Sequence, residues 1–229
     1  EAGILALCAK AVLPEGHVAA VCVWPQFVGI ARRVLKGNAV RIATVANFPA
    51  GGTHVGRITS DVAEALSDGA DEIDLVMPYK AFLDGDTDIA AEMIGEVRAA
   101  CERKTLKIIL ESGAFPDQAS LRRACELAIG AGADFLKTST GKIEISATPA
   151  AAETILDTIK ASGRPVGFKA SGGIRTLAEA RIYLDLADRI MGPGWATPVT
   201  FRFGASGLHG VLIDAISGKA PGERADGAY

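Results

Sequence analysis

The sequence has few of the residues that build disulfide frameworks or metal sites. Its four cysteines are far apart in the chain and form no CxxC pair: Cys8, Cys22, Cys101 and Cys125. Its three histidines, His17, His54 and His209, show no metal-ligand spacing. Structural disulfides and zinc sites depend on such clusters, so we predict no metal, no other cofactor and a reducing, cytoplasmic location.

Long apolar runs and an excess of one charge are also missing. No segment approaches the roughly 18 uninterrupted apolar residues of a membrane helix, and the apolar start EAGILALCAKAV lacks the flanks of a secretion signal. The formal charge is −3, from 24 basic and 27 acidic residues. This balance argues against wrapping nucleic acid or coating a membrane, so any anion site must be local.

What the sequence does contain is a repeating alternation of short β-rich runs and longer amphipathic stretches. Eight strands are predicted, at 19–24, 41–47, 72–77, 106–111, 134–139, 165–170, 188–192 and 201–206. Helices are predicted at 1–12, 56–68, 88–103, 117–131, 149–162 and 177–185. Such alternation predicts right-handed βαβ units, and a count of eight favours an α/β fold of the (β/α)8 TIM-barrel type. We expect one domain over residues 1–217 and a flexible tail over 218–229.

Two lysines lie inside apolar strands, which is an unusual place for an ammonium group. Lys137 occurs in GADFLKTSTGK and Lys169 in VGFKASGGIRT. Strand alternation allows both side chains to point into a barrel, and it does the same for Asp74 in EIDLVMPY. A buried ammonium must be paired or used chemically, so we expect these three groups to converge.

Convergence of this kind suits an amine nucleophile, because only a neutral amine attacks a carbonyl. Burial and a second ammonium both lower the pKa of a lysine, so Lys169 would activate Lys137 while Asp74 relays protons. The alternative is a set of structural ion pairs inside the barrel. Lys107 and Glu111 also face the barrel interior or its rim, where they could set the charge balance around the lysine pair.

Glycine-rich turns follow three of the strands and suit a phosphate group. The candidates are Gly141 with Lys142, Gly172 with Gly173, and Gly204 through Ser206, and Arg175 could add charge. Glycine lets backbone N–H groups approach an anion, and the start of a following helix adds partial positive charge. Each glycine pair alone also fits an ordinary strand-to-helix turn, so the prediction depends on their recurrence beside the lysines.

Taken together, the motifs resemble the deoxyribose-phosphate aldolase family over nearly the whole chain. In order they are AAVCVWPQFV, VRIATVANFP, ADEIDLVMPY, LKIILESG, GADFLKTSTGK, VGFKASGGIRT and FRFGAS. The resemblance implies a metal-free class I aldolase that reversibly cleaves 2-deoxy-D-ribose 5-phosphate into D-glyceraldehyde 3-phosphate and acetaldehyde. It implies the Schiff base at Lys137, with Lys169 and Asp74 assisting, and phosphate contacts at the glycine loops. It also implies a role in deoxyribonucleoside catabolism and, by analogy, a homodimer.

Three features qualify what the resemblance implies. Tyr229 ends the chain as in relatives whose terminal tyrosine shuttles protons, but a terminus without function fits equally well. Relatives usually carry an Asp-Xaa-Thr segment before the first helix, and this chain begins inside that helix, so we expect the contribution of that segment to be absent or truncated. Gly207 stands in GASGL where relatives often have another hydroxyl, which would weaken one phosphate contact.

Two other functions remain open from the sequence. A related Schiff-base aldolase acting on another phosphosugar would keep Lys137 and the glycine loops but differ in its acceptor pocket. A sugar-phosphate binding protein would form no lysine adduct.

Overall fold

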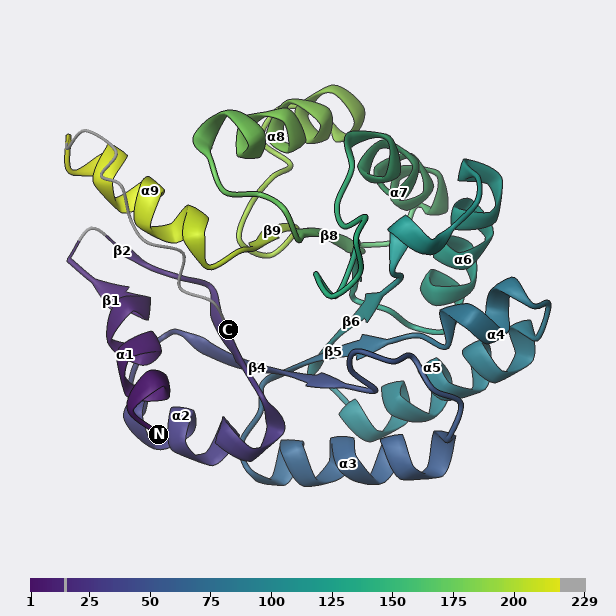
Figure 1. Cartoon of the computed structure of the whole chain (residues 1–229), viewed down its shortest axis with the longest axis horizontal. Coiled ribbons are helices and arrows are strands. Elements are labelled where there is room, and N and C mark those ends of the chain that lie inside the picture. The colour runs from purple at the N-terminus through teal and green to yellow at the C-terminus, as the bar shows by residue number, and fades with distance from the viewer. Residues whose placement is uncertain (15, 219–229) are drawn as a thin grey trace.

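A curled parallel sheet of seven strands forms the centre of the molecule. The computed structural model describes residues 1–14 and 16–218. The strands run in the order β3 (Ala20–Val23), β4 (Arg41–Ala46), β5 (Glu72–Val76), β6 (Thr105–Ile109), β7 (Phe135–Lys137), β8 (Gly167–Ser171) and β9 (Phe201–Gly204). Each strand is parallel to its neighbour along the chain. Figure 1 shows the sheet curving inside an arc of helices. Every residue of β5, β7 and β8 is buried, as expected for strands covered on both faces.

Helices connect successive strands and cover the outer face of the sheet. They are α1 (Ala2–Ala11), α2 (Val28–Val34), α3 (Val55–Ser67), α4 (Tyr79–Leu83), α5 (Thr87–Cys101), α6 (Gln118–Gly130), α7 (Pro149–Ser162), α8 (Leu177–Met191) and α9 (Gly207–Ile216). Two short 3-10 helices, Pro25–Phe27 and Ser112–Ala114, and a hairpin of β1 (Val12–Leu13) and β2 (Gly16–His17) complete the described elements. All six predicted helices are confirmed: five agree to within two residues at each end, and the one predicted at 177–185 continues to Met191.

Local sequence signals account for several helix starts. Asp117 accepts a hydrogen bond from the Ser120 amide before α6, and Thr148 caps α7 just ahead of a proline. Thr176 and Glu179 form a reciprocal capping box at the start of α8. These caps fix where each helix leaves the loop that follows a strand, and those loops form the rim of the site.

The predicted strand at 188–192 is wrong, because this segment is the last turn of α8. Tyr183, Ala187 and Ile190 are buried at helical spacing, while Asp188 and Arg189 are exposed. A strand would have put neighbouring residues on opposite faces, whereas this pattern continues the amphipathic helix to Gly192, whose φ of 103° ends it. The sheet in the described residues therefore has seven strands, and the expected closed barrel of eight is not confirmed.

The sheet is open on one side. Within residues 1–14 and 16–218, β3 pairs only with β4 and β9 only with β8. Helices α1 and α9 lie at the two ends of the arc (Figure 1) and carry exposed apolar side chains such as Leu5, Leu212 and Ile216. The architecture is thus an α/β half-barrel of TIM-like form.

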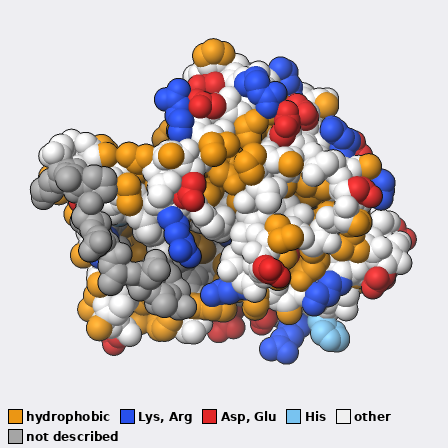
Figure 2. All heavy atoms as spheres, turned by 45° about the horizontal axis from the view of Figure 1, so that its top comes forward, with side chains coloured by type: hydrophobic (Ala, Val, Ile, Leu, Met, Phe, Trp, Pro, Cys, Tyr) orange, Lys and Arg blue, Asp and Glu red, His pale blue; other side chains and the backbone are white. Residues whose placement is uncertain are grey.

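Charges of both signs are mixed on the face of the molecule drawn in Figure 2, where lysine and arginine side chains are interspersed with aspartate and glutamate. None of the helices in the described part of the chain combines the length and apolarity required to span a bilayer.

Candidate active site

Strand register brings Asp74, Lys137 and Lys169 together inside the curved sheet. Lys137 is the register partner of Lys169 on β8, and Asp74 lies on β5, two strands away. Lys137 Nζ lies 2.8 Å from Asp74 Oδ2, and Lys169 Nζ lies 2.7 Å from the same oxygen. The predicted convergence is confirmed, and both amines share one carboxylate oxygen.

Both lysines are buried, but the charges around them make their pKa values differ. Burial is the largest influence on Lys137, and together with the Lys169 cation it holds the pKa of Lys137 below its usual value despite the attraction of Asp74. Burial also acts to lower the pKa of Lys169, but there Asp74, with help from Cys22 and Glu72, outweighs it, so the pKa of Lys169 is raised. Lys137 therefore loses its proton more easily than Lys169 does.

Asp74 remains a carboxylate because several ammonium groups surround it. Its complete burial would by itself raise its pKa, but Lys107, Lys137 and Lys169 together hold that pKa well below the usual range. Lys107 Nζ donates to the other oxygen, Oδ1, at 2.7 Å. Each oxygen of this carboxylate thus has at least one cation.

The glycine turns lie at the carboxyl ends of β7, β8 and β9. A Cβ added to Gly141 would lie 3.8 Å from the Gly172 Cα, so the first two turns approach each other closely. Gly141, Gly172 and Gly173 have φ values of 74°, 91° and 82°, which favour glycine. A Cβ on Gly204 would collide with Ser171 Oγ and lie 3.0 Å from Lys169 Cε, so the third turn directly adjoins Lys169.

Not every predicted phosphate donor is equally available. The backbone N–H of Lys142 already donates to Thr140 Oγ1 at 3.0 Å, and its side chain is exposed. Ser206 is the N-cap residue of α9, and its side chain makes no capping hydrogen bond. Arg175 donates its backbone N–H to Glu179 at the start of α8. The binding roles of these residues remain predictions.

Glu111 fixes the loop after β7, a role that the sequence did not reveal. This buried residue follows β6 with a φ of 58°. Its carboxylate accepts the Thr140 N–H at 3.1 Å and the Thr140 hydroxyl at 2.5 Å. Gly113 leaves room for the same loop, because a Cβ there would collide with the Ile145 carbonyl oxygen. The signal available in the sequence was a carboxylate directly after an apolar strand.

Glu72 is the second residue whose part was missed. It lies two residues before Asp74 on β5, so strand alternation puts both carboxylates on one face. Its Oε2 lies 2.6 Å from Lys107 Nζ, and Arg202 approaches it at 3.3 Å. Lys107 was predicted to face either the interior or the rim, and its side chain is buried in the interior.

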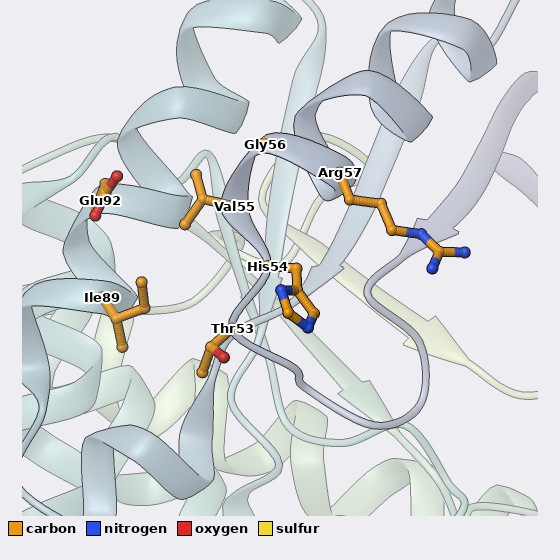
Figure 3. Close-up of a pocket in the computed structure, with 7 residues that line it drawn as sticks. All are labelled: Thr53, His54, Val55, Gly56, Arg57, Ile89 and Glu92. Atoms are coloured by element: carbon orange, nitrogen blue, oxygen red, sulfur yellow. The ribbon is translucent and has the colours of Figure 1, made fainter.

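Two surface cavities lie away from these groups, between α3 and α5. The larger, of about 580 Å³, is lined by Thr53, His54, Val55, Gly56, Arg57, Ile89 and Glu92 (Figure 3). The other, of about 440 Å³, shares Val55, Gly56 and Glu92 with it. Neither cavity is lined by a lysine of the cluster, so buried charge, rather than cavity size, identifies the reactive centre.

Tyr229 lies outside the described residues, as does the predicted tail beyond Gly218.

Comparison with known proteins agrees with the geometry. The profile of the DeoC/LacD family aldolases matches residues 3–197. The deoxyribose-phosphate aldolase of Agrobacterium fabrum is 49% identical over 226 residues, which cover 98% of this chain and 87% of the relative. An apo crystal structure assigned to a deoxyribose-phosphate aldolase of Toxoplasma gondii ME49 superposes with a TM-score of 0.87 at 26% identity, covering 96% of this chain and 89% of the other. One assigned likewise from Coccidioides immitis gives 0.82 at 28% identity, with 93% and 79% covered. The chain belongs to the DeoC/LacD family of aldolases.

Proposed function

We propose that this protein is a deoxyribose-phosphate aldolase that reversibly cleaves 2-deoxy-D-ribose 5-phosphate into D-glyceraldehyde 3-phosphate and acetaldehyde. The observation that carries the proposal is the pair of buried amines, Lys137 and Lys169, on one oxygen of Asp74. The 49% identity to a deoxyribose-phosphate aldolase supports the substrate.

The chemistry begins at Lys137. Its neutral amine adds to the C1 aldehyde of the open-chain sugar, and loss of water from the carbinolamine gives an iminium. A base removes the proton of the C3 hydroxyl, the C2–C3 bond breaks, and its electron pair moves into the iminium to give an enamine. D-glyceraldehyde 3-phosphate leaves at this step. Protonation of the enamine at C2 and addition of water then release acetaldehyde and restore the amine.

Asp74 and Lys169 supply the proton transfers in this proposal. Lys169 stays protonated beside the carboxylate, so it acts as the acid that helps water leave the carbinolamine, and Asp74 receives and returns protons. The cation at Lys169 also favours the neutral form of Lys137, since two ammonium groups repel each other.

The glycine turns hold the phosphate in this proposal. Gly141 and Gly173 leave open space beside the backbone, whereas Gly172 and Gly204 lie against the side chains of Ser146 and Ser171, so an anion would contact the serine hydroxyls at those two turns. Lys142 and Ser206 add a cation and a hydroxyl at the rim. A phosphate held there lies at the carboxyl ends of the strands, above the lysine pair. The sugar carbons would then extend down to Lys137.

Several wider features belong to the same proposal. A further strand paired with both β3 and β9 would close the sheet into a (β/α)8 barrel, because each now has one unpaired edge among the described residues. The barrel domain would comprise residues 1–217. Free cysteines fit a cytoplasmic enzyme of deoxyribose phosphate catabolism, and the family resemblance supports a homodimer.

Reductive trapping tests the chemistry directly. The protein is incubated with acetaldehyde, reduced with borohydride and digested for mass spectrometry. We expect an ethyl group on Lys137 in the wild-type protein and none at that position in Lys137→Ala. The exposed Lys36 is the internal control for nonspecific modification. A folded wild-type protein without the adduct would overturn the proposal.

A further inference from the structure

Beneath the lysine pair lies a second buried charge pair that none of the covalent steps uses. Glu72 and Lys107 are both fully buried, and Lys107 is among the largest fully buried side chains of the chain. Lys107 Nζ lies 2.6 Å from Glu72 Oε2 and 2.7 Å from Asp74 Oδ1. Burying charges is costly, and apolar residues of similar volume would often stabilise the core better. A pair that is retained here therefore calls for a functional explanation.

The surroundings of this pair close the inner end of the site. The Arg202 guanidinium lies 3.3 Å from Glu72 and 5.5 Å from the centre of the Phe135 ring. Gly167 has no side chain, and a Cβ there would collide with that ring, so the ring occupies the space beside β8. Glu72, Lys107, Phe135 and Arg202 together form what we term the floor of the site.

The floor contacts Asp74 on the oxygen that faces away from the two amines. A carboxylate can rotate to share its oxygens among several cations, but Lys107 holds Oδ1, and Glu72 in turn holds Lys107. The remaining oxygen, Oδ2, is left facing Lys137 and Lys169. We propose that Glu72 and Lys107 are positioning residues that aim Asp74 at the two amines and balance the charge around them. The inference rests on the proposed function and deepens it.

The charge balance gives the two residues opposite effects. Asp74 on β5, Lys169 on β8 and Cys22 on β3 act on Lys137 directly. Lys107 on β6 shares the Asp74 carboxylate with it, and Glu72, Arg202 and Arg41 are the next charges outward. Removing the Lys107 cation makes protonation of Lys137 easier. Removing the Glu72 anion leaves Lys107 less neutralised and makes protonation of Lys137 harder.

The test compares Lys107→Met, Glu72→Gln and the double variant in the full chain, using the pH dependence of kcat/KM and of the rate of adduct formation at Lys137. The acid limb reports the fraction of neutral amine in the free enzyme. We expect it to move up by about one pH unit in Lys107→Met and down by about one unit in Glu72→Gln. In the double variant we expect the acid limb of kcat/KM to lie near the wild-type pH. We expect kcat to be about tenfold below wild type, because Asp74 Oδ2 is no longer held toward the two amines.

Limbs that stay in place, or move in the same direction in both single variants, overturn the inference. If a single variant does not fold, the test uses the double variant alone. A double variant with wild-type kcat would overturn the positioning role. The proposed function fails separately, through absence of the Lys137 adduct in the wild-type protein. An adduct with unmoved limbs rejects only the role of the floor.

Discussion

The two sides of the curved sheet differ in how completely they are built. On the side of β5 to β8, the strands are almost wholly buried, and Asp74 contacts three ammonium groups. On the other side, β3 and β9 each have an unpaired edge among the described residues, and α9 buries only Leu208 and Asp214 of its ten residues. Reactive groups need fixed geometry, which paired strands provide. Changes on the first side should therefore alter the chemistry, and changes on the outer face of α9 should leave it intact.

Lys137→Ala should have the largest effect, because it removes the nucleophile from the well-ordered side. We expect the cleavage rate to fall by about 10³-fold or more, measured as production of D-glyceraldehyde 3-phosphate. Lys36→Ala, at an exposed position, is the matched control and should retain wild-type activity. Substantial cleavage by Lys137→Ala would mean that another amine carries the reaction.

Asp74→Asn should cost the most stability, since it leaves three ammonium groups without their shared carboxylate. We expect a loss of about 3–5 kcal/mol in the free energy of unfolding, measured by urea titration at pH 7.

The same variant has a pH signature. The folded-state pKa of Asp74 is depressed, so its contribution is fully present above the unfolded pKa of about 3.9 and is lost as pH falls through the folded value. The stability difference between wild type and Asp74→Asn should accordingly shrink below about pH 4. A difference independent of pH down to acid unfolding would contradict the assigned charge state.

Lys169→Met should reduce activity less than loss of the nucleophile. We expect cleavage to fall by about 10²-fold through loss of the acid, and the acid limb of kcat/KM to move to higher pH because the pKa of Lys137 rises without its cationic neighbour. An acid limb that moves to lower pH would show that the two ammonium groups do not repel each other in the free enzyme.

The same contrast between the two sides explains what the sequence could reveal. Alternation placed Lys137, Lys169 and Asp74 on one face because strands in a fully covered sheet are regular. The short β-rich run at 188–192 was misleading, because Ile190 is buried at helical spacing with Tyr183 and Ala187 and the segment continues α8. A sequence pattern shows which face a side chain lies on, but not which atoms it reaches on the next strand. The contact between Glu72 and Lys107 was therefore visible only in the structure.

Glu111→Gln tests how far the ordered region extends into the phosphate loops. Glutamine keeps the size of the side chain, but its amide replaces one of the two oxygens that accept from Thr140. Loss of one hydrogen bond to Thr140 should weaken phosphosugar binding by about 1 kcal/mol. KM would then rise several-fold while kcat changes little. Glu144→Gln, at an exposed position in the same loop, is the control. A fall in kcat at constant KM would place Glu111 in the chemistry instead.

The smallest effect is expected on the open side, at the outer face of α9. Leu212 is 38% exposed and Leu208 is 2% exposed on the same helix. Leu208→Ala should destabilise the protein by about 2–5 kcal/mol, because it empties a packed position, whereas Leu212→Ala should change stability by less than about 0.5 kcal/mol. Neither should alter the pH profile of cleavage. If Leu212→Ala proved as costly as Leu208→Ala, the outer face of α9 would be covered in solution, and the sheet would be closed or shielded on the side that is open in this structure.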